Sequence, residues 1–162
     1  MQTSGLHKLI GIKNLTDSTY LLQIEKNNMI FEAGQHILLG RYNDPDQREY
    51  SIYSGADDNY LEILIKEISD GTVSKHLKNI LPGEILNVEG PLGFFGLDKE
   101  KIDSHKHLFI ASGTGIAPFH SMVRSYPTLN YTILHGIRTC DEAYGKESFE
   151  PDRYIRCASR DT

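Results

Sequence analysis

The sequence has little cysteine and no long apolar segment. Its two cysteines, Cys140 and Cys157, stand at no metal-ligand spacing. This is typical of a reducing compartment and excludes a cysteine-ligated iron–sulfur cluster within the chain. No apolar run approaches the roughly 20 residues that cross a bilayer, and residues 1–5 lack the basic and apolar pattern of a signal peptide. We therefore expect a cytoplasmic protein without a membrane segment.

Basic charge is also scarce. The 162 residues carry 17 basic and 22 acidic side chains, for a net charge of −5. Non-specific nucleic-acid binding needs a basic surface, so we expect no nucleic-acid partner. Hydrophobic residues make up 39% and charged residues 24% of the chain, which is typical of a soluble globular protein. The length fits one ordinary domain or two small ones.

The first half has the pattern of a small antiparallel β-barrel. Short runs of strand-forming residues alternate with turn-rich segments. Gly90-Pro91-Leu92-Gly93 predicts a turn after the last of these runs. The predicted strands are residues 7–12, 19–24, 35–39, 48–54, 60–68 and 84–88.

One helix, over residues 72–81, is predicted within this half. Gly71 precedes it, Thr72 or Ser74 is available to cap its start, and Pro82-Gly83 ends it. Helical spacing places four apolar residues on one side, which we expect to be buried: Val73, Leu77, Ile80 and Leu81.

The second half has the rhythm of a parallel α/β unit. The apolar run 107–111 predicts a strand buried on both faces. A glycine-rich turn follows, then a helix that ends at Pro127, and then strands over 131–134 and 153–158. This order implies parallel strands with right-handed crossovers. We place the domain boundary in the charged stretch near residue 100, so that residues 1–100 form the barrel and 101–162 the α/β domain.

The segment Arg48–Ser54 carries unusual side chains for a strand. Arg48 and Tyr50 lie on one face, and Ser51 and Tyr53 on the other. A guanidinium beside a planar ring suits a ligand with a phosphate at one end and a flat heterocycle at the other. The alternative is an edge strand of mixed exposure.

Gly113-Thr114-Gly115-Ile116-Ala117-Pro118 lies between a predicted buried strand and a helix. Glycines there let the backbone approach a phosphate, and amides at the helix start face the anion. The spacing matches the dinucleotide fingerprint except that Pro118 replaces the third glycine, which the first turn of a helix tolerates. The alternative is a tight turn with no ligand.

Two further segments have weaker signals. Gly71-Thr72-Val73-Ser74 opens a helix and by the same reasoning suits a pyrophosphate, or is an ordinary capped helix preceded by the solvated Lys66. Ser159-Arg160 follows a predicted parallel strand and suits a phosphate on a ribose, or is a polar chain end.

Neither a metal site nor a hydrolase triad is predicted. His36, His107 and His120 lie in or beside apolar runs, without acidic or cysteine partners at metal spacing. No Ser/His/Asp spacing suggests a hydrolase, although such triads need not be visible in a sequence.

The order of these motifs along the chain resembles the ferredoxin–NADP reductase family. Arg-x-Tyr-Ser, Gly-x-x-Ser, Gly-Pro-x-Gly, Gly-Thr-Gly-Ile-Ala-Pro and Ser-Arg follow one another between the first strand and Thr162. The resemblance implies an all-β plus α/β fold, with a Greek-key FAD-binding barrel followed by an NADP-binding α/β domain.

The resemblance also implies residue roles. Arg48 would pair with the flavin pyrophosphate. Tyr50 would stack on the isoalloxazine ring and Ser51 would hydrogen-bond near N5, which makes these two the residues at the reacting ring. Ser159 and Arg160 would bind the 2′-phosphate, which favours NADPH over NADH. The other implied cofactor-binding residues are Ile65 and Lys66 beside the flavin, Gly71, Thr72, Val73 and Ser74 under the pyrophosphate, and Gly113, Thr114 and Gly115 at the nicotinamide nucleotide.

The function implied is hydride transfer from NADPH to FAD, then electron transfer to ferredoxin or flavodoxin. Family members continue beyond the point where this chain stops, at Thr162. We therefore expect an incomplete α/β domain, FAD binding with poor hydride transfer, and an open sheet edge that favours dimerisation or domain swapping. Two alternatives stay open: a flavin-bearing electron-transfer subunit of a larger complex, and a truncated form that binds FAD without turnover.

Overall fold

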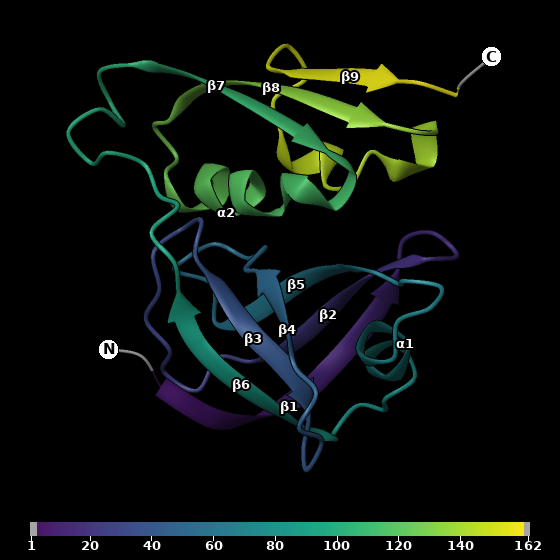
Figure 1. Ribbon diagram of the computed structural model, residues 1–162. Helices are drawn as coiled ribbons and strands as arrows, with labels where there is room; N and C mark the ends of the chain where they lie inside the picture. Colours follow the sequence, from purple (N-terminus) through teal and green to yellow (C-terminus); the bar gives the residue numbers. More distant parts are fainter. Residues whose placement is uncertain (1–2, 161–162) are drawn as a thin grey trace.

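The computed structural model describes residues 3–160 and contains two sheets, one above the other (Figure 1). The first has six antiparallel strands in the order β4-β3-β6-β1-β2-β5, and the second has three parallel strands in the order β7-β8-β9. The predicted fold class, an antiparallel barrel followed by a partial parallel α/β unit, is confirmed. Residues 1–2 were assigned to the barrel and residues 161–162 to the α/β domain, and both pairs lie outside the described part of the chain.

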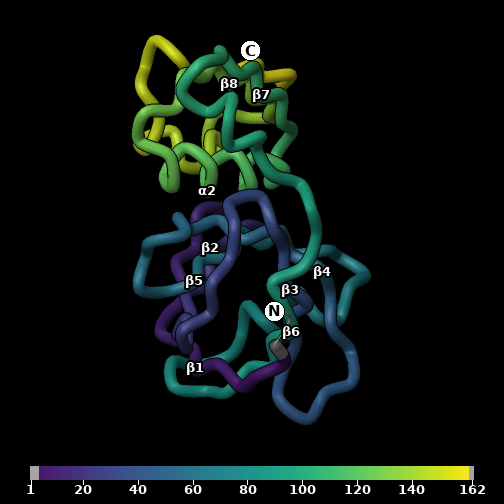
Figure 2. Tube along the Cα trace, turned by 90° about the vertical axis from the view of Figure 1, so that its left-hand side faces the viewer, coloured from purple at the N-terminus to yellow at the C-terminus, as the bar shows by residue number. Residues whose placement is uncertain are grey.

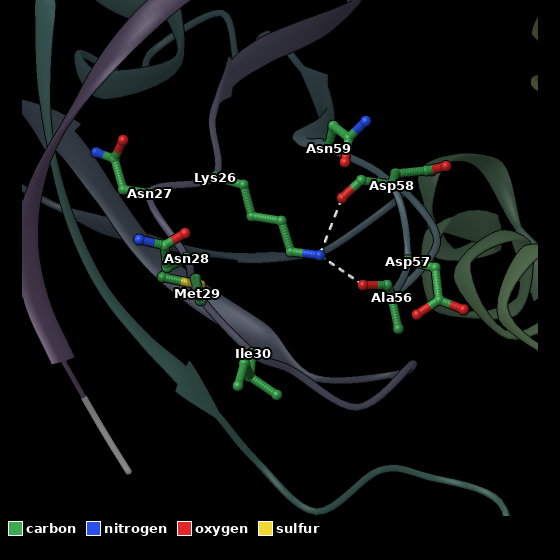
Figure 3. A pocket seen from close by; sticks show the side chains of 9 residues that line it. All are labelled: Lys26, Asn27, Asn28, Met29, Ile30, Ala56, Asp57, Asp58 and Asn59. Atoms are coloured by element: carbon green, nitrogen blue, oxygen red, sulfur yellow. Dashed lines mark hydrogen bonds between the residues drawn. The ribbon is translucent and has the colours of Figure 1, made fainter.

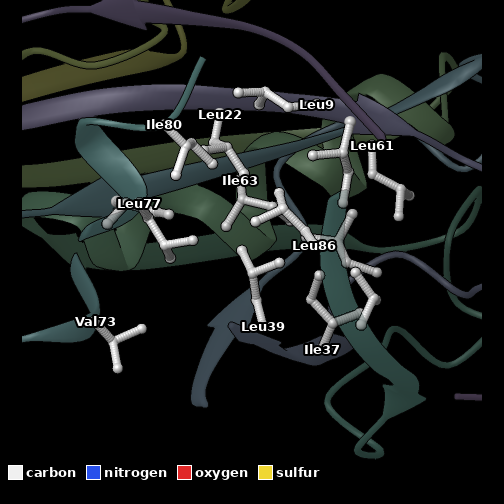
Figure 4. Close-up of a cluster of buried hydrophobic side chains, with 14 of the residues drawn as sticks. Leu9, Leu22, Ile37, Leu39, Leu61, Ile63, Val73, Leu77, Ile80 and Leu86 are labelled. Atoms are coloured by element: carbon white, nitrogen blue, oxygen red, sulfur yellow. The ribbon is translucent and has the colours of Figure 1, made fainter. Parts of the chain in front are cut away.

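The six strands of the first sheet close into a barrel because its two edges meet. The backbone just after β4 forms a bridge between Ile52 and Ile63 of β5. Inward-facing Leu and Ile side chains from all around the barrel fill its interior (Figure 4). The strands are β1 (Thr3–Asn14), β2 (Thr19–Glu25), β3 (His36–Arg41), β4 (Arg48–Ser51), β5 (Tyr60–Lys66) and β6 (Ile85–Leu92).

Three predictions for the barrel were wrong in detail. The strand predicted through Ser54 ends at Ser51, and the carbonyls of Tyr53 and Ser54 accept hydrogen bonds from His120 and Ser121 of the α/β unit. The turn predicted at residues 90–93 is largely strand, since β6 continues to Leu92 while pairing with β1 and β3. Helix α1 (Val73–Lys78) is shorter than predicted. Leu81 therefore lies beyond it and is 68% exposed, whereas Val73, Leu77 and Ile80 are buried.

The second sheet consists of β7 (Lys106–Ser112), β8 (Asn130–Ile137) and β9 (Tyr154–Ala158). A 3₁₀ turn, η1 (Gly113–Ile116), leads from β7 into α2 (Ala117–Ser125). Figure 1 shows α2 between this sheet and the barrel, and Figure 2 shows the chain passing once between the two units. Two further 3₁₀ turns lie between β8 and β9: η2 (Cys140–Glu142) and η3 (Lys146–Ser148).

The prediction that the strand over 107–111 is buried on both faces was wrong. Leu108 is 61% exposed and Ile110 67% exposed, while Phe109 and Ala111 are buried. The reason is that α2 covers only the face of the sheet that is turned toward the barrel (Figure 1). The boundary between residues 100 and 101 stays a prediction. Within residues 3–160, no helix is long and apolar enough to cross a membrane.

The barrel and the α/β unit are joined by close polar contacts just after β4. The His120 ring of α2 stacks on the Tyr53 ring, with 3.6 Å between the ring centroids. Nδ1 of His120 donates to the Tyr53 carbonyl at 2.7 Å. Ser121 Oγ donates to the Ser54 carbonyl at 2.7 Å. Gly145 has φ +69°, and a Cβ there would come within 2.2 Å of the Tyr53 hydroxyl. This packing fixes the segment after β4 against α2.

Candidate functional site

A cavity of about 440 Å³ opens on the outside of the barrel, between β4, β5 and the start of α1. We call it the barrel cavity. Three segments that the sequence predicted to share a ligand meet in it. Its walls are Arg48, Glu49, Tyr50, Leu64, Lys66, Ile68, Gly71, Thr72, Val73, Ser74 and Thr114.

Arg48 and Tyr50 supply a cation and a ring to this cavity. Alternation along β4 puts both side chains on the same side of the strand. The Arg48 side chain is exposed, and its Nη1 donates to the Gln47 carbonyl at 2.7 Å. Tyr50 is half-buried against the barrel core. Burial raises the pKa of Tyr50, against the opposing effect of the Arg48 charge, so its hydroxyl is neutral at physiological pH.

The loop before α1 closes the far end of the barrel cavity. Thr72 occupies the N-cap position, but neither it nor Ser74 caps the helix through its side chain, so the predicted cap was wrong. The buried Ser74 Oγ instead accepts the Ile68 N–H at 3.1 Å, and the Ser74 carbonyl accepts the Tyr20 hydroxyl at 2.6 Å. Because Ser74 Oγ accepts in this bond, its own O–H is left able to donate into the cavity.

Two residues assigned to the flavin stand apart from the cavity wall. Ile65 is fully buried in the barrel core, because side chains alternate along β5 and those of Leu64 and Lys66 point outward. Leu64 therefore takes the wall position expected of Ile65. Ser51 pairs with His36 at the end of β4 and is half-buried next to the wall formed by Tyr50.

A second cavity, of about 470 Å³, lies at the carboxyl ends of the parallel strands. We call it the turn cavity. Gly113 has φ +51°, which favours glycine. A Cβ at Gly113 or Gly115 would meet no protein atom within 4 Å, so the space beside this turn is open. The walls of the turn cavity are Lys66, Ser112, Gly113, Thr114, Gly136, Ile137, Arg138, Cys157 and Ser159.

The predicted Ser159-Arg160 pair is only partly at this cavity. Ser159 lines it and donates from Oγ to the Ile137 carbonyl at 3.3 Å. The exposed Arg160 donates its backbone N–H to the Arg138 carbonyl at 2.8 Å, and its side chain is not part of the wall. Arg138, which follows β8, is the arginine in the wall. The reasoning that selected Ser159, a polar residue after a parallel strand, would also have selected Arg138.

The two cavities share two wall residues, Lys66 and Thr114. Lys66 Nζ donates to Glu142 Oε1 at 2.9 Å, and the Arg138 N–H donates to Glu142 Oε2 at 3.0 Å. Burial pushes the pKa of Glu142 upward, but these hydrogen bonds outweigh that effect and leave the pKa below its ordinary value. Glu142 is thus a charged anchor for Lys66. Its role was missed because the sequence offers no local signal for it.

A larger cavity, of about 710 Å³, lies between residues 26–30 and 56–59 (Figure 3). Its cation, Lys26, donates to the carbonyls of Ala56 and Asp58 and lies over the Phe31 ring at 5.3 Å. This lysine therefore ties two loops together. None of the residues predicted to bind a cofactor lines this cavity.

Comparison with known proteins identifies the family of the chain. Residues 8–96, more than half of the chain, match the Oxidoreductase FAD-binding domain family. The chain is 31% identical to the flavodoxin/ferredoxin–NADP reductase of Rhodobacter capsulatus, over 86% of this chain and 55% of that protein. It is 34% identical to NADH-cytochrome b5 reductase 2 of Emericella nidulans, over 72% of this chain and 38% of that protein.

Solved structures show the same fold. A ferredoxin–NADP⁺ reductase from Neisseria gonorrhoeae with bound FAD and NADP superposes with a TM-score of 0.82 at 22% identity, over 96% of this chain and 67% of that one. The reductase from Plasmodium falciparum has a TM-score of 0.82 at 24% identity, over 96% of this chain and 69% of that one. The chain spans about half the length of the curated reductase from R. capsulatus. By its matched domain, its fold and its relatives, the chain belongs to the family of FAD-binding oxidoreductases that includes the ferredoxin–NADP reductases.

Proposed function

We propose that the chain binds FAD in the barrel cavity and NADP(H) in the turn cavity, and that it passes a hydride from NADPH to the flavin. The observation that carries this proposal is the shared wall at Lys66 and Thr114. Hydride transfer requires the nicotinamide and flavin rings to come into contact, and two adjoining cavities with a common wall meet that requirement.

The barrel cavity fits the chemistry of FAD. The Arg48 guanidinium suits a pyrophosphate, and the half-buried Tyr50 ring offers an apolar face to a flat heterocycle. The Ser74 hydroxyl lies in the same wall and is able to donate to a phosphate. When bound, FAD supplies the redox chemistry, taking electrons as a pair and releasing them singly.

The chain's own residues would bind, orient and shield the reactants. Tyr50 would hold the ring against the barrel, with Ser51 beside it as the donor near N5. At the turn cavity, Gly113, Thr114 and Gly115 would let the backbone approach the nucleotide. Ser159 and an arginine would face a 2′-phosphate, which favours NADPH. These positions are supported by the cavity walls: Tyr50 lines the barrel cavity, Ser159 lines the turn cavity, and Thr114 lines both.

We propose ferredoxin or flavodoxin as the electron acceptor, following the printed name of the R. capsulatus relative. A cytoplasmic location stays a prediction. A second candidate is a flavin-bearing electron-transfer subunit that handles no nicotinamide. The position of Arg160, whose side chain is not part of the turn-cavity wall, favours this alternative.

Two measurements test these proposals in sequence. Purified protein is first titrated with FAD and its absorption spectrum recorded; flavin bands that stay with the protein through gel filtration are expected. NADPH is then added anaerobically and bleaching of the bound flavin is followed, before a dye is added as final acceptor to recover the flavin colour. Bound flavin that NADPH fails to bleach would favour the electron-transfer subunit. A protein that refuses FAD would contradict both candidates.

A further inference from the structure

We propose that His135 is a positioning residue for nicotinamide-nucleotide binding, because it pins the Gly113 carbonyl and thereby fixes the turn that lines both cavities. This inference rests on the proposed function, since the turn is proposed there to approach the nucleotide. His135 lines neither cavity. It acts through Gly113 and does not touch the ligand itself.

His135 is fully buried in the middle strand of the parallel sheet. Its neighbours in register are Ala111 of β7 and Arg156 of β9, but its ring contacts neither of them through a hydrogen bond. Nε2 lies 2.8 Å from the Gly113 carbonyl oxygen, and Nδ1 lies 2.8 Å from the Tyr154 hydroxyl. One ring on β8 therefore links the residue that follows β7 to the first residue of β9.

These partners fix the tautomer of the ring. A carbonyl oxygen only accepts, so Nε2 of His135 carries the hydrogen and donates to Gly113. In the neutral ring Nδ1 is then an acceptor, and the Tyr154 hydroxyl donates to it. Burial lowers the pKa of His135 and keeps the ring neutral, although the hydrogen bond to Gly113 and the charge of Glu142 oppose that shift.

Pinning the Gly113 carbonyl also orients the next amide. The carbonyl of Gly113 and the N–H of Thr114 belong to one planar trans peptide, so they point in opposite directions. With the oxygen held on His135, in the buried side of the sheet, the Thr114 N–H is aimed away from the sheet interior. Gly113 has no side chain and a φ of +51°, so its own backbone restrains this peptide weakly.

The test compares three variants of the full chain loaded with FAD. His135→Leu removes both hydrogen bonds, whereas His135→Gln keeps an amide N–H that reaches toward Gly113. Tyr131→Phe is the matched control, because it deletes another hydroxyl of the same sheet, the one that accepts the Glu150 N–H. The dissociation constants of NADP⁺ and FAD are measured by titration, and melting temperatures are recorded.

We expect His135→Leu to weaken NADP⁺ binding at least tenfold with little change in FAD affinity, and His135→Gln to restore it to within about threefold of wild type. Tyr131→Phe should lower the melting temperature and leave NADP⁺ affinity unchanged. Wild-type NADP⁺ affinity in His135→Leu overturns the inference. So does a parallel loss of NADP⁺ affinity and melting temperature in all three variants, because that would mark a purely structural histidine.

Hydrogen exchange separates this inference from the proposed function. In nucleotide-free protein, His135→Leu should speed amide exchange in residues 113–117, and His135→Gln should not. If wild-type protein fails to bind NADP⁺, the proposed function fails at the turn cavity, and the exchange result still decides whether His135 holds the turn. Unchanged exchange in His135→Leu overturns the positioning role.

Discussion

Lys66 and Glu142 form an ion pair that joins the barrel to the α/β unit at the place where the two cavities meet. Lys66 Nζ lies 2.9 Å from Glu142 Oε1, and the two side chains are 28% and 12% exposed. Lys66 belongs to the walls of both cavities. The position of this cation is therefore set by a carboxylate from the opposite unit.

We predict that this pair couples the two units measurably. A double-mutant cycle with Lys66→Met and Glu142→Gln should give a coupling free energy of about 1 kcal/mol in urea unfolding, since the pair is largely shielded from water. The Lys99–Glu32 pair is the matched control, because its side chains are 71% and 63% exposed. The same cycle on Lys99→Met and Glu32→Gln should show no measurable coupling. Equal coupling in the two pairs would contradict the prediction.

Tyr50→Ala should weaken FAD binding about five- to tenfold, which corresponds to the roughly 1 kcal/mol that aromatic stacking supplies. The bound-flavin spectrum should also change, because the ring would lose its stacking partner. Tyr50→Phe keeps the ring and should bind FAD almost as wild type does. Titration followed by absorbance checks both variants. An unchanged affinity and spectrum in Tyr50→Ala would place the flavin ring elsewhere.

Arg160→Ala should reduce the preference for NADPH over NADH if its guanidinium turns toward the ligand, and Arg138→Ala should do so from the cavity wall. Loss of one charged hydrogen bond to a phosphate predicts a fall of about tenfold or more in the ratio of NADPH to NADH affinity. Arg41→Ala, on β3 of the barrel, is the control. A ratio that no arginine variant alters would argue against a 2′-phosphate site.

His120 makes stability depend on pH. Burial lowers the pKa of His120 from 6.5 to about 4, although its bond to the Tyr53 carbonyl opposes the shift. The unfolded chain therefore gains a proton as pH falls through 6.5, and the folded chain does so only near 4. The free energy of unfolding is therefore not reduced by His120 above pH 6.5. Titration of this residue alone lowers it by about 3 kcal/mol by pH 4.

Urea unfolding at pH 7.5 and pH 4.5 checks this dependence. His120→Asn keeps an N–H for the Tyr53 carbonyl but does not titrate, so the difference between its stabilities at the two pH values should be smaller than in wild type. Carboxylates that titrate in the same range act equally on both proteins and cancel in the comparison. An identical difference in the two proteins would contradict the assignment.

The uncovered face of the second sheet should favour self-association. Leu108 and Ile110 of β7 are exposed side by side, and Ile155 of β9 is 46% exposed on the same face. We predict a concentration-dependent dimer by light scattering, which Leu108→Thr with Ile110→Thr should weaken. The double substitution Ile10→Thr and Leu6→Thr, at exposed positions of β1, is the control. A monomer at millimolar concentration would count against the prediction.

The order of elements could be predicted because each half has its own periodicity. Alternation and turn residues defined the barrel strands, and the apolar runs at 107–111 and 131–134 defined parallel strands. The exposure of Leu108 and Ile110 could not be predicted, because the sequence of an apolar strand does not show whether one or both of its faces are covered. What covers a face depends on elements elsewhere in the chain.

For the candidate site too, residues with a local sequence signal could be predicted, and residues whose partners lie far away in the sequence could not. Arg48 and Tyr50 were chosen from local pattern and Lys66 from the family resemblance, and one cavity wall contains all three. The resemblance named Ile65, but the side chain in the cavity wall is that of Leu64, because a shift of one residue reverses which side of a strand a side chain faces. Glu142 and His135 were missed because their partners lie 76 and 22 residues away along the chain.

The short segment from Tyr50 to Tyr53 is a spacer between the two cavities. Tyr50 lies in the wall of one cavity, and the Tyr53 carbonyl is held by the helix that follows the glycine turn of the other. Gly145 packs so close to the Tyr53 hydroxyl that a side chain at position 145 would collide with it. Adding or removing a residue in this segment would shift the barrel cavity relative to the glycine turn. The interval between these two tyrosines thus sets how the barrel cavity is aligned with the turn cavity.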